Sequence, residues 1–311
     1  MTVPQIRPVA TLAAVARPSV DVVVPFRGAP AELEEVLTCL DRLRLGPKDS
    51  LVVVDNTPGH APAAGREGEA ASVMLATLVA TPGYARNRGA EGGSGDWLVF
   101  IDADTVPEPD LLDRYFEPWP QERTALLAGA VRDQAVPVRG NAVARYAHIR
   151  GLMGQDNTFD FGRWSFPQTA NAACCRAAFD AVGGFREDIR AAEDADLTFR
   201  LEAAGWGVER REGAAVVHRS RQTVRGLVAQ KLGHGAGAAW LAREYPGSFP
   251  PRRRPGLLWW GVRTAVRGMV SAVRARDRDI ALFAVFHPLE LIAYEFGRSL
   301  HNRPRQDHGS G

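Results

Sequence analysis

WLVFIDADTVP, residues 97–107, is the stretch of sequence that decides the fold of this chain. Its first five residues are apolar and mostly aromatic or β-branched, which indicates a β-strand buried on both faces. The strand ends on two carboxylates, Asp102 and Asp104, and the small Ala103 between them leaves room for a ligand. Two hard oxygen ligands at this point suit a divalent cation that itself holds a diphosphate. Alternatively, the two aspartates only form a turn and cap a short helix over 111–116.

The segments before this strand predict a parallel sheet covered by helices, and therefore the α/β fold class. We expect strands at 20–25, 51–55 and 73–80, with helices at 31–43 and 83–90. A strand, a helix and a second strand at this spacing form a right-handed parallel crossover. Open α/β sheets bind ligands at the carboxyl ends of their strands. Asp55, at the end of the second strand, should therefore lie near Asp102 and Asp104.

The pattern continues with a fifth strand over 126–131 and a hairpin or strand pair over 208–217 that ends at His218. Between them, Gly183-Gly184-Phe185 indicates a tight turn. A helix then opens on Glu193-Asp194-Ala195-Asp196 and ends at Gly205. Acidic side chains are favourable at a helix N-terminus for electrostatic reasons alone. Part of this cluster, Asp196 in particular, is therefore open to interpretation as helix capping.

The C-terminal third predicts helices and carries a strong positive charge. Residues 222–240 have helical character interrupted by the glycine-rich run 233–237, and 257–296 indicate two or three helices that pack on the body or lie at a membrane interface. No apolar run approaches the ~20 residues of a transmembrane helix. Residues 219–311 hold 16 Lys and Arg against 6 Asp and Glu, a net charge of +10, whereas 1–218 have a net charge of −8. The basic region favours contact with a membrane surface or another partner that carries phosphates, with a solvated basic face as the alternative.

The composition narrows the class of protein and its compartment. An apolar fraction of 45% and a charged fraction of 24% are those of a globular chain rather than a disordered one. The three cysteines, of which Cys174 and Cys175 are adjacent, form no disulfide framework and no zinc spacing. We therefore expect a cytoplasmic location, including the inner face of the membrane. Residues 9–16 imitate a short signal segment, but Arg7 is the only basic residue before them, so secretion is not expected.

Six short motifs, taken in order, resemble family 2 glycosyltransferases of the GT-A fold, of the non-processive bacterial type. They are Val24-Pro25, Asp55, Gly83 to Asn87, Asp102-Ala103-Asp104, Gly183-Gly184-Phe185 and Glu193-Asp194. The resemblance implies a Rossmann-like, mostly parallel sheet flanked by helices, with a helical basic extension. The expected division is an N-terminal tail at 1–18, the GT-A catalytic domain at 19–220, the helical extension at 221–301 and a disordered tail at 302–311.

The resemblance also implies an activity. It is that of a metal-dependent, inverting hexosyltransferase, which moves a sugar from a nucleotide-diphospho-sugar to a hydroxyl group. The acceptor is lipid-linked, a saccharide or a secondary metabolite, and no nucleic-acid partner is expected.

The resemblance assigns roles to individual residues. Asp102 and Asp104 would hold Mn²⁺ or Mg²⁺ and, through it, the diphosphate, and His218 stands where some relatives place a further metal ligand. Asp194 would be the general base and Glu193 would orient or bind the acceptor. The remaining donor-binding residues would be Pro25, Arg27, Asp55, Arg86, Asn87 and Ala103.

The chemistry of the residues agrees with these roles. Departure of a nucleoside diphosphate needs a cation, and the acceptor hydroxyl needs a base on the opposite face of the sugar. A carboxylate beside a second carboxylate has a raised pKa, as expected for Asp194 beside Glu193. A single base with direct displacement inverts the anomeric configuration.

Two departures from the family pattern limit the range of reactions. Asp55-Asn56 replaces the more familiar Asp-Asp, and the Gln-x-x-Arg-Trp motif of processive synthases is absent, with Arg221 to Arg225 as its nearest local analogue. A processive polymerase is therefore not expected. Two alternatives remain: a nucleotidyltransferase, which would want a glycine-rich basic loop after the first strand, and a nucleotide-sugar-binding relative without catalysis.

Overall fold

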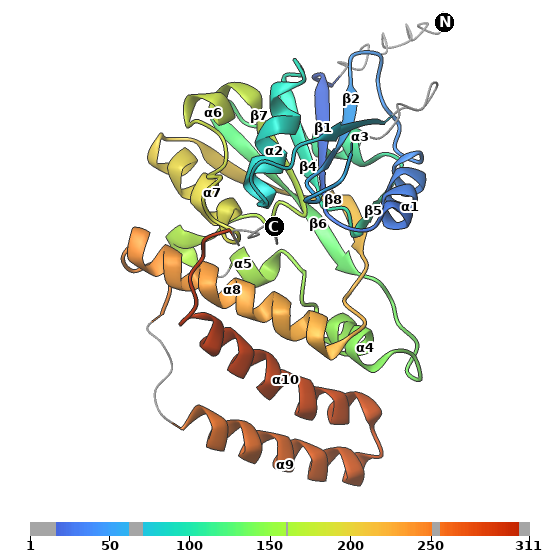
Figure 1. The fold of residues 1–311 in the computed structure, drawn as a ribbon, viewed down its shortest axis with the longest axis vertical. Helices are drawn as coiled ribbons and strands as arrows, with labels where there is room; N and C mark the ends of the chain where they lie inside the picture. Colours follow the sequence, from blue (N-terminus) through green and yellow to red (C-terminus); the bar gives the residue numbers. More distant parts are fainter. Residues whose placement is uncertain (1–16, 62–70, 160, 251–255, 305–311) are drawn as a thin grey trace, which may run out of the picture.

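The computed structural model describes residues 17–61, 71–159, 161–250 and 256–304, and within them the chain forms one mixed eight-stranded sheet (Figure 1). The strands, in chain order, are β1 Val20–Phe26, β2 Ser50–Asp55, β3 Ser72–Leu75, β4 Trp97–Ile101, β5 Thr105–Pro107, β6 Thr124–Asp133, β7 Asn171–Cys175 and β8 Gly207–His218. Their order in the sheet is β3-β2-β1-β4-β7-β6-β8-β5. Strands β1 to β4 are mutually parallel, which confirms the predicted crossovers.

Strand β4 lies in the interior of the sheet and is buried on both faces, and its apolar sequence predicts this burial. It pairs with β1 in parallel and with β7 in antiparallel register, and all five of its residues are buried. Side chains that alternate along a strand point to opposite faces, so β4 contributes to two cores. Val99 and Ile101 join one cluster, while Leu98 and Phe100 join the other.

Helices cover both faces of the sheet. Helices α1 (Pro30–Leu40) and α3 (Leu111–Tyr115) pack on one face. Helices α2 (Pro82–Glu91), α6 (Arg176–Ala181) and α7 (Glu193–Ala203) pack on the other. Between β6 and β7 the chain forms α4 (Ala142–Arg150), the short α5 (Asp156–Phe159) and a 3₁₀ turn at Gly162–Trp164. This is the predicted α/β architecture.

Three strand predictions were incomplete. Strand β3 ends at Leu75 rather than near residue 80. Residues 207–218 form one long strand, β8, which pairs with β6 in parallel and with β5 in antiparallel register, instead of a hairpin. Strand β7 was not predicted, because Asn, Ala and Cys give no β-branched or aromatic pattern. Its extended form is imposed by its own hydrogen bonds to β4 on one side and to β6 on the other.

The C-terminal extension consists of three long helices stacked away from the sheet (Figure 1). They are α8 (Val224–Glu244), α9 (Leu257–Ala275) and α10 (Arg278–Gly297). The predicted interruption of α8 at its glycines was wrong, because the helix is continuous. A β-carbon on Gly235 would collide with the carbonyl oxygen of Tyr294, so this glycine lets α8 and α10 pack closely. Pro288 likewise lies inside α10 without ending it.

The end of the described chain returns to the part of the molecule that contains the sheet. After α10, the carbonyl of Asn302 accepts a hydrogen bond from the backbone N–H of Arg190 at 3.1 Å. The Asn302 side-chain amide donates to the carbonyl of Ala191 at 2.8 Å. The extension therefore holds the loop that leads into α7. Most of the predicted tails, 1–18 and 302–311, and the arginine run 252–254 lie outside the described residues.

Candidate active site

A cleft of about 700 Å³ opens at the carboxyl edge of the parallel strands. It is lined by Pro25, Phe26, Arg27, Glu32, Glu35, Val36, Asn56, Ala80, Thr81, Pro82, Ala85, Arg86, Asp102, Ala103, Asp104, Arg190, Glu193, Arg219 and Arg221. The sequence-predicted residues that the structure brings together here are Pro25, Arg27, Arg86, Asp102, Ala103, Asp104 and Glu193. The cleft lies where an open α/β sheet binds ligands.

Arg86 links two of these carboxylates and is the buried centre of the cleft wall. Its Nη2 donates to Asp102 Oδ1 and its Nη1 to Glu193 Oε1, both at 2.7 Å. The side chain of Arg86 is only 4% exposed, and that of Glu193 only 8%. A buried charge is tolerated only when it is paired and hydrogen-bonded. Arg86 therefore fixes the position of the strand β4 aspartate relative to the start of α7.

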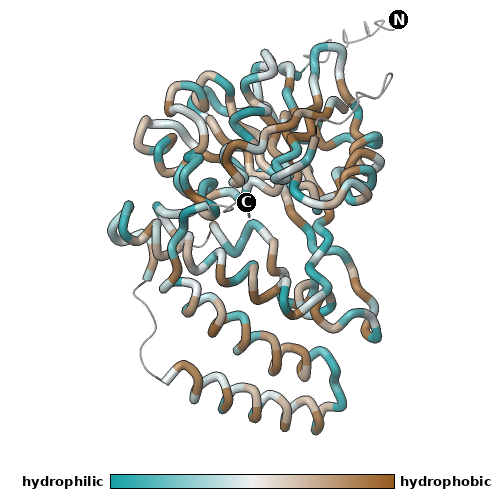
Figure 2. Tube along the Cα trace, in the orientation of Figure 1, coloured by the Kyte–Doolittle hydropathy of each residue, from teal (hydrophilic) through white to brown (hydrophobic). Residues whose placement is uncertain are grey.

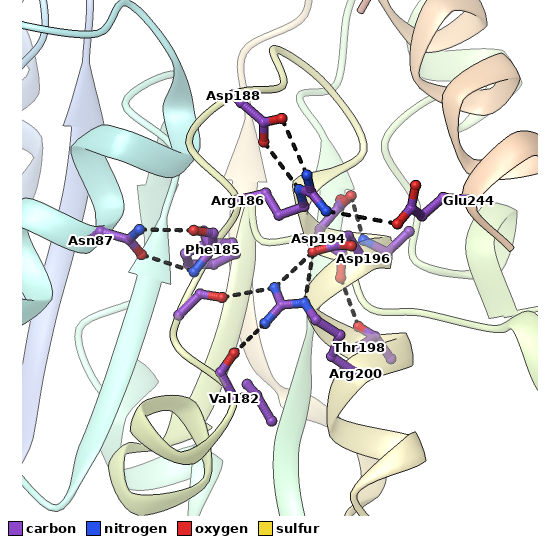
Figure 3. Close-up of polar contacts among 12 residues, drawn as sticks. Asn87, Val182, Phe185, Arg186, Asp188, Asp194, Asp196, Thr198, Arg200 and Glu244 are labelled. Atoms are coloured by element: carbon purple, nitrogen blue, oxygen red, sulfur yellow. Dashed lines mark hydrogen bonds and ion pairs between the residues drawn. The ribbon is translucent and has the colours of Figure 1, made fainter.

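The Gly183-Gly184-Phe185 turn is hydrogen-bonded to both α2 and α7. Asn87, next to Arg86 on α2, exchanges two hydrogen bonds of 2.9 Å with the backbone of Phe185, as Figure 3 shows. Gly184 has φ 67°, and a β-carbon there would lie 2.8 Å from Asn87 Oδ1, so the close approach requires glycine. Asn87 was predicted to line the donor pocket; the structure instead places its amide on this turn and not among the residues that line the cleft.

Asp196 holds the turn from the side of α7. Its Oδ2 accepts two hydrogen bonds from Arg200, at 2.9 and 2.7 Å, and Arg200 also donates to the carbonyls of Val182 and Gly184 (Figure 3). The hydroxyl of Tyr245 donates to Asp196 Oδ1 at 2.7 Å. The acidic group at this position is therefore part of a buried ion pair. Both carboxylate oxygens therefore accept from side chains rather than from backbone N–H groups at the start of α7.

Asp194 has the electrostatic setting of a general base. It lies in the first turn of α7, half-buried, and its Oδ1 accepts a hydrogen bond from the N–H of Ala195 at 2.8 Å. Burial, followed by the negative charge of Glu193, raises the pKa of Asp194 to about 7. A carboxylate with this pKa can accept a proton near neutral pH and release it again.

Asp104, which lines the cleft, lies beside His218, which is buried and is not among the lining residues. Asp104 Oδ2 lies 3.6 Å from His218 Nε2 and 3.1 Å from Arg221 Nη2. On its other side, His218 Nδ1 contacts Asp133 Oδ1 at 3.0 Å. Burial opposes the charged form of His218, but the two aspartates outweigh it and raise the pKa of His218 to about 9. Asp133 was not identified from the sequence, although its place at the end of β6 offered a signal.

Asp102, Asp104 and His218 have the donor atoms that a divalent cation needs, but their side chains are not arranged around a common point. Two carboxylates and an imidazole whose other nitrogen is fixed by Asp133 are the donor types of such sites. However, Asp102 is turned to Arg86, and within the described residues no group of three or more His, Cys, Asp or Glu side chains forms a ready metal site. The metal roles of Asp102, Asp104 and His218 stay predictions.

Asp55 ends strand β2 and is held by contacts within its own loop. Its carboxylate accepts a hydrogen bond from the N–H of Thr57 at 2.9 Å and contacts His60 Nδ1 at 2.8 Å. Asp55 is buried, and it is the next residue, Asn56, that lines the cleft. The contact of Asp55 with a nucleotide stays a prediction.

Three arginines that line the cleft were not predicted from the sequence. Arg190, Arg219 and Arg221 line it together with Arg27 and Arg86. Arg219 and Arg221 follow directly on β8, so their place at the carboxyl edge could have been inferred once β8 was known to run parallel to β6. Arg190 Nε is buried and has no hydrogen-bond partner among the described residues. Five guanidinium groups around one cleft suit a ligand with several negative charges.

Comparison with protein-family models matches residues 97–294 to the glycosyl transferase family group 2. Among curated proteins, the pre-mycofactocin glycosyltransferase of Mycobacterium tuberculosis is 30% identical over 242 residues, which are 75% of this chain and 49% of the relative. The succinoglycan biosynthesis protein ExoA of Rhizobium meliloti is 31% identical over 160 residues, which are 48% of this chain and 46% of the relative. The chain thus spans about half the length of the curated relatives it matches.

Two solved structures share the fold. A mannosyltransferase from Pyrobaculum calidifontis, in complex with GDP-Man and Mn²⁺, superposes with a TM-score of 0.59 at 16% identity, covering 90% of this chain and 86% of that one. TarS of S. aureus, in complex with UDP-GlcNAc, gives 0.50 at 14% identity, covering 86% and 90%. At these identities the likeness concerns the fold alone, which is GT-A.

Proposed function

The chain belongs to glycosyl transferase family group 2, and from this premise we propose that it transfers a sugar from a nucleotide-diphospho-sugar to a hydroxyl acceptor, with inversion and with the help of a divalent cation. The observation that carries the proposal is the pair of hydrogen bonds by which Arg86 joins Asp102 to Glu193 on one wall of the cleft. Asp102 follows the end of β4, and Glu193 is the sequence neighbour of Asp194. Family membership sets aside the nucleotidyltransferase alternative.

The donor diphosphate is proposed to lie between Asp104 and the arginines of the cleft. Arg190 and Arg27 have no carboxylate partner among the described residues, so they are available to phosphate oxygens. Mn²⁺ or Mg²⁺, held by Asp102 and Asp104 with His218 behind, would neutralise the departing diphosphate. Arg221, which now pairs with Asp104 at 3.1 Å, is close enough to exchange that carboxylate for a phosphate.

Asp194 is proposed to take the proton from the acceptor hydroxyl as the bond to the anomeric carbon forms and the bond to the diphosphate oxygen breaks. Glu193 raises the pKa of Asp194 but is itself held by Arg86, so its proposed role is positioning. Because a single base acts on one face of the sugar, the product has the inverted configuration. No second carboxylate is assigned as a nucleophile, and the transfer is proposed to be non-processive.

The acceptor is proposed within three classes: lipid-linked, saccharide or secondary metabolite. Two named relatives suggest which to test first, since one is named for pre-mycofactocin and the other for succinoglycan biosynthesis. The three cysteines are free in the structure, which supports the proposed reducing, cytoplasmic location.

Calorimetric titration of the protein with UDP, GDP and dTDP, each with Mn²⁺ and with EDTA, tests the donor site. Binding of one nucleotide that requires Mn²⁺ and is lost in Asp104→Ala supports the proposal. Tight binding that ignores EDTA would remove the cation from the scheme. Binding by Asp194→Asn together with loss of transfer separates the base from the donor site, whereas full transfer by this variant would refute its role.

A further inference from the structure

Helix α9 carries a continuous apolar surface that nothing in the described chain covers. Its exposed apolar residues are Leu258, Trp259, Val262, Val266, Met269, Val270 and Val273, here called the α9 stripe. Their exposed fractions range from 38% for Met269 to 71% for Val273. At 3.6 residues per turn they fall within about 120° of the helix circumference. Figure 2 shows apolar segments recurring along this outermost helix.

The stripe is not the inner face of α9, because that face is already packed. Gly261 lies against Pro288 and Ile292 of α10, and Gly268 lies against Ala284. Ala272 is buried on the same side. Helix α9 is therefore apolar on two faces, one turned to α10 and one turned outward. Exposed apolar patches of this kind mark interaction surfaces.

A row of arginines borders the stripe on one side. Arg263, Arg267 and Arg274 follow at intervals of four and seven residues, so they share a face next to the apolar one. All three are exposed, and none has a carboxylate partner within the described residues. The guanidinium of Arg263 lies 5.1 Å from the ring centre of Trp259. An apolar face with arginines along its edge is the pattern of a helix that lies in the plane of a membrane interface.

We propose that the α9 stripe docks this protein on an anionic phospholipid surface, with α9 parallel to the membrane plane. The apolar side chains would enter the acyl boundary while the arginines reach the phosphate groups. A second copy of the chain that packed its stripe antiparallel on this one would place the two arginine rows on the same side, where their charges repel each other. The proposal concerns attachment and does not depend on the transfer reaction.

Helix α10 supports flat docking rather than a membrane span. No apolar run of spanning length was expected from the sequence, yet α10 is the one helix in the described residues whose length and composition would allow it to cross a membrane. In the structure, however, it is packed between α8 and α9 (Figure 1). It also buries Glu290, whose Oε2 accepts a hydrogen bond from Tyr146 of α4 at 2.8 Å. Leaving this position would expose Gly235 and the buried polar partners of Glu290.

Flotation of the full chain with vesicles tests the proposal. We compare vesicles of phosphatidylcholine alone with vesicles that also contain phosphatidylglycerol, at low and high salt. Binding to the anionic vesicles should exceed binding to the neutral ones and weaken as salt shortens the range of electrostatic attraction. Trp259→Ser/Val266→Ser/Val273→Ser should lower the affinity by about tenfold or more. Arg263→Gln/Arg267→Gln/Arg274→Gln should lower it by about fivefold for each arginine.

Trp119→Ser is the matched control, since Trp119 is 54% exposed on the catalytic body and should leave vesicle binding unchanged. All substituted side chains are exposed, so thermal unfolding should remain that of the original chain. Absence of flotation, equal binding to both kinds of vesicle, or equal loss in Trp119→Ser would overturn the proposal. So would a dimer in light scattering that the triple serine variant dissolves while neither chain binds vesicles.

Discussion

Replacing Arg86 with methionine should destabilise the protein far more than a surface arginine would. Loss of one member of a buried ion pair costs ~3–5 kcal/mol, because the remaining charge stays buried without a partner. Glu193 is 8% exposed and would bear that cost in full, whereas Asp102, at 30%, can be partly rehydrated. We therefore expect a loss near the lower end, about 3 kcal/mol. This corresponds to a fall of roughly 5 °C in the unfolding midpoint.

The control for this variant is Arg88→Met on the same helix. Arg88 is 34% exposed and pairs with Glu91 and Glu187 at the surface, where such pairs contribute ~0–1 kcal/mol. The double variant Arg86→Met/Glu193→Gln should recover part of the loss, since it also removes the unpaired carboxylate. Thermal unfolding followed by circular dichroism measures all three. If Arg86→Met loses no more than Arg88→Met, or the double variant recovers nothing, the inferred bridge is wrong.

Three further predictions concern catalysis and packing. Asp194→Asn should lower kcat by about 10²–10⁴-fold while nucleotide binding in calorimetry stays unchanged; equal losses in both would contradict a role as base. A base acts in its deprotonated form, and the pKa of Asp194 is raised to about 7. The value of kcat should therefore fall about tenfold for each pH unit below about 7 and level off above it. A flat pH profile down to pH ~5 would refute this role. Gly235→Ala should lower the unfolding midpoint, since its β-carbon would collide with the Tyr294 carbonyl oxygen. Gly233→Ala in the same helix meets nothing within 4 Å and should raise the free energy of unfolding by ~0.5–1 kcal/mol. The same shift in both variants would count against close packing of α8 on α10.

The sequence was sufficient where the signal was local. The run of apolar residues in β4 predicted a strand buried on both faces, and the structure confirms it. The carboxylates that follow this strand line a cleft, and their roles there stay predictions. The parallel crossovers followed from the spacing of strands and helices. Asp102, Asp104 and Glu193 reach one cleft because this topology carries strand ends and helix starts to the same edge.

Contacts between distant segments could not be predicted. Arg86 finds Glu193 across 107 positions of sequence, and no periodicity announces such a pair. The glycines of α8 indicated a break because glycine is a poor helix former, yet packing against α10 required glycine at position 235. Strand β7 has a composition without β propensity and is extended only because β4 and β6 pair with it. In each case tertiary contact overrode local preference.

The two hydrogen bonds of Asn302 to the loop at Arg190 and Ala191 have a consequence for how the chain can be shortened. The loop they hold is followed directly by Glu193 and Asp194, and Gly237 of α8 supports the same loop, with its β-carbon position 2.9 Å from Ala192. The turn at Asn302 thus fixes the loop that leads into the start of α7. A chain ending before Asn302 should keep its sheet and its nucleotide site but hold the proposed base less firmly. Such a truncation would lower kcat before it lowers donor affinity.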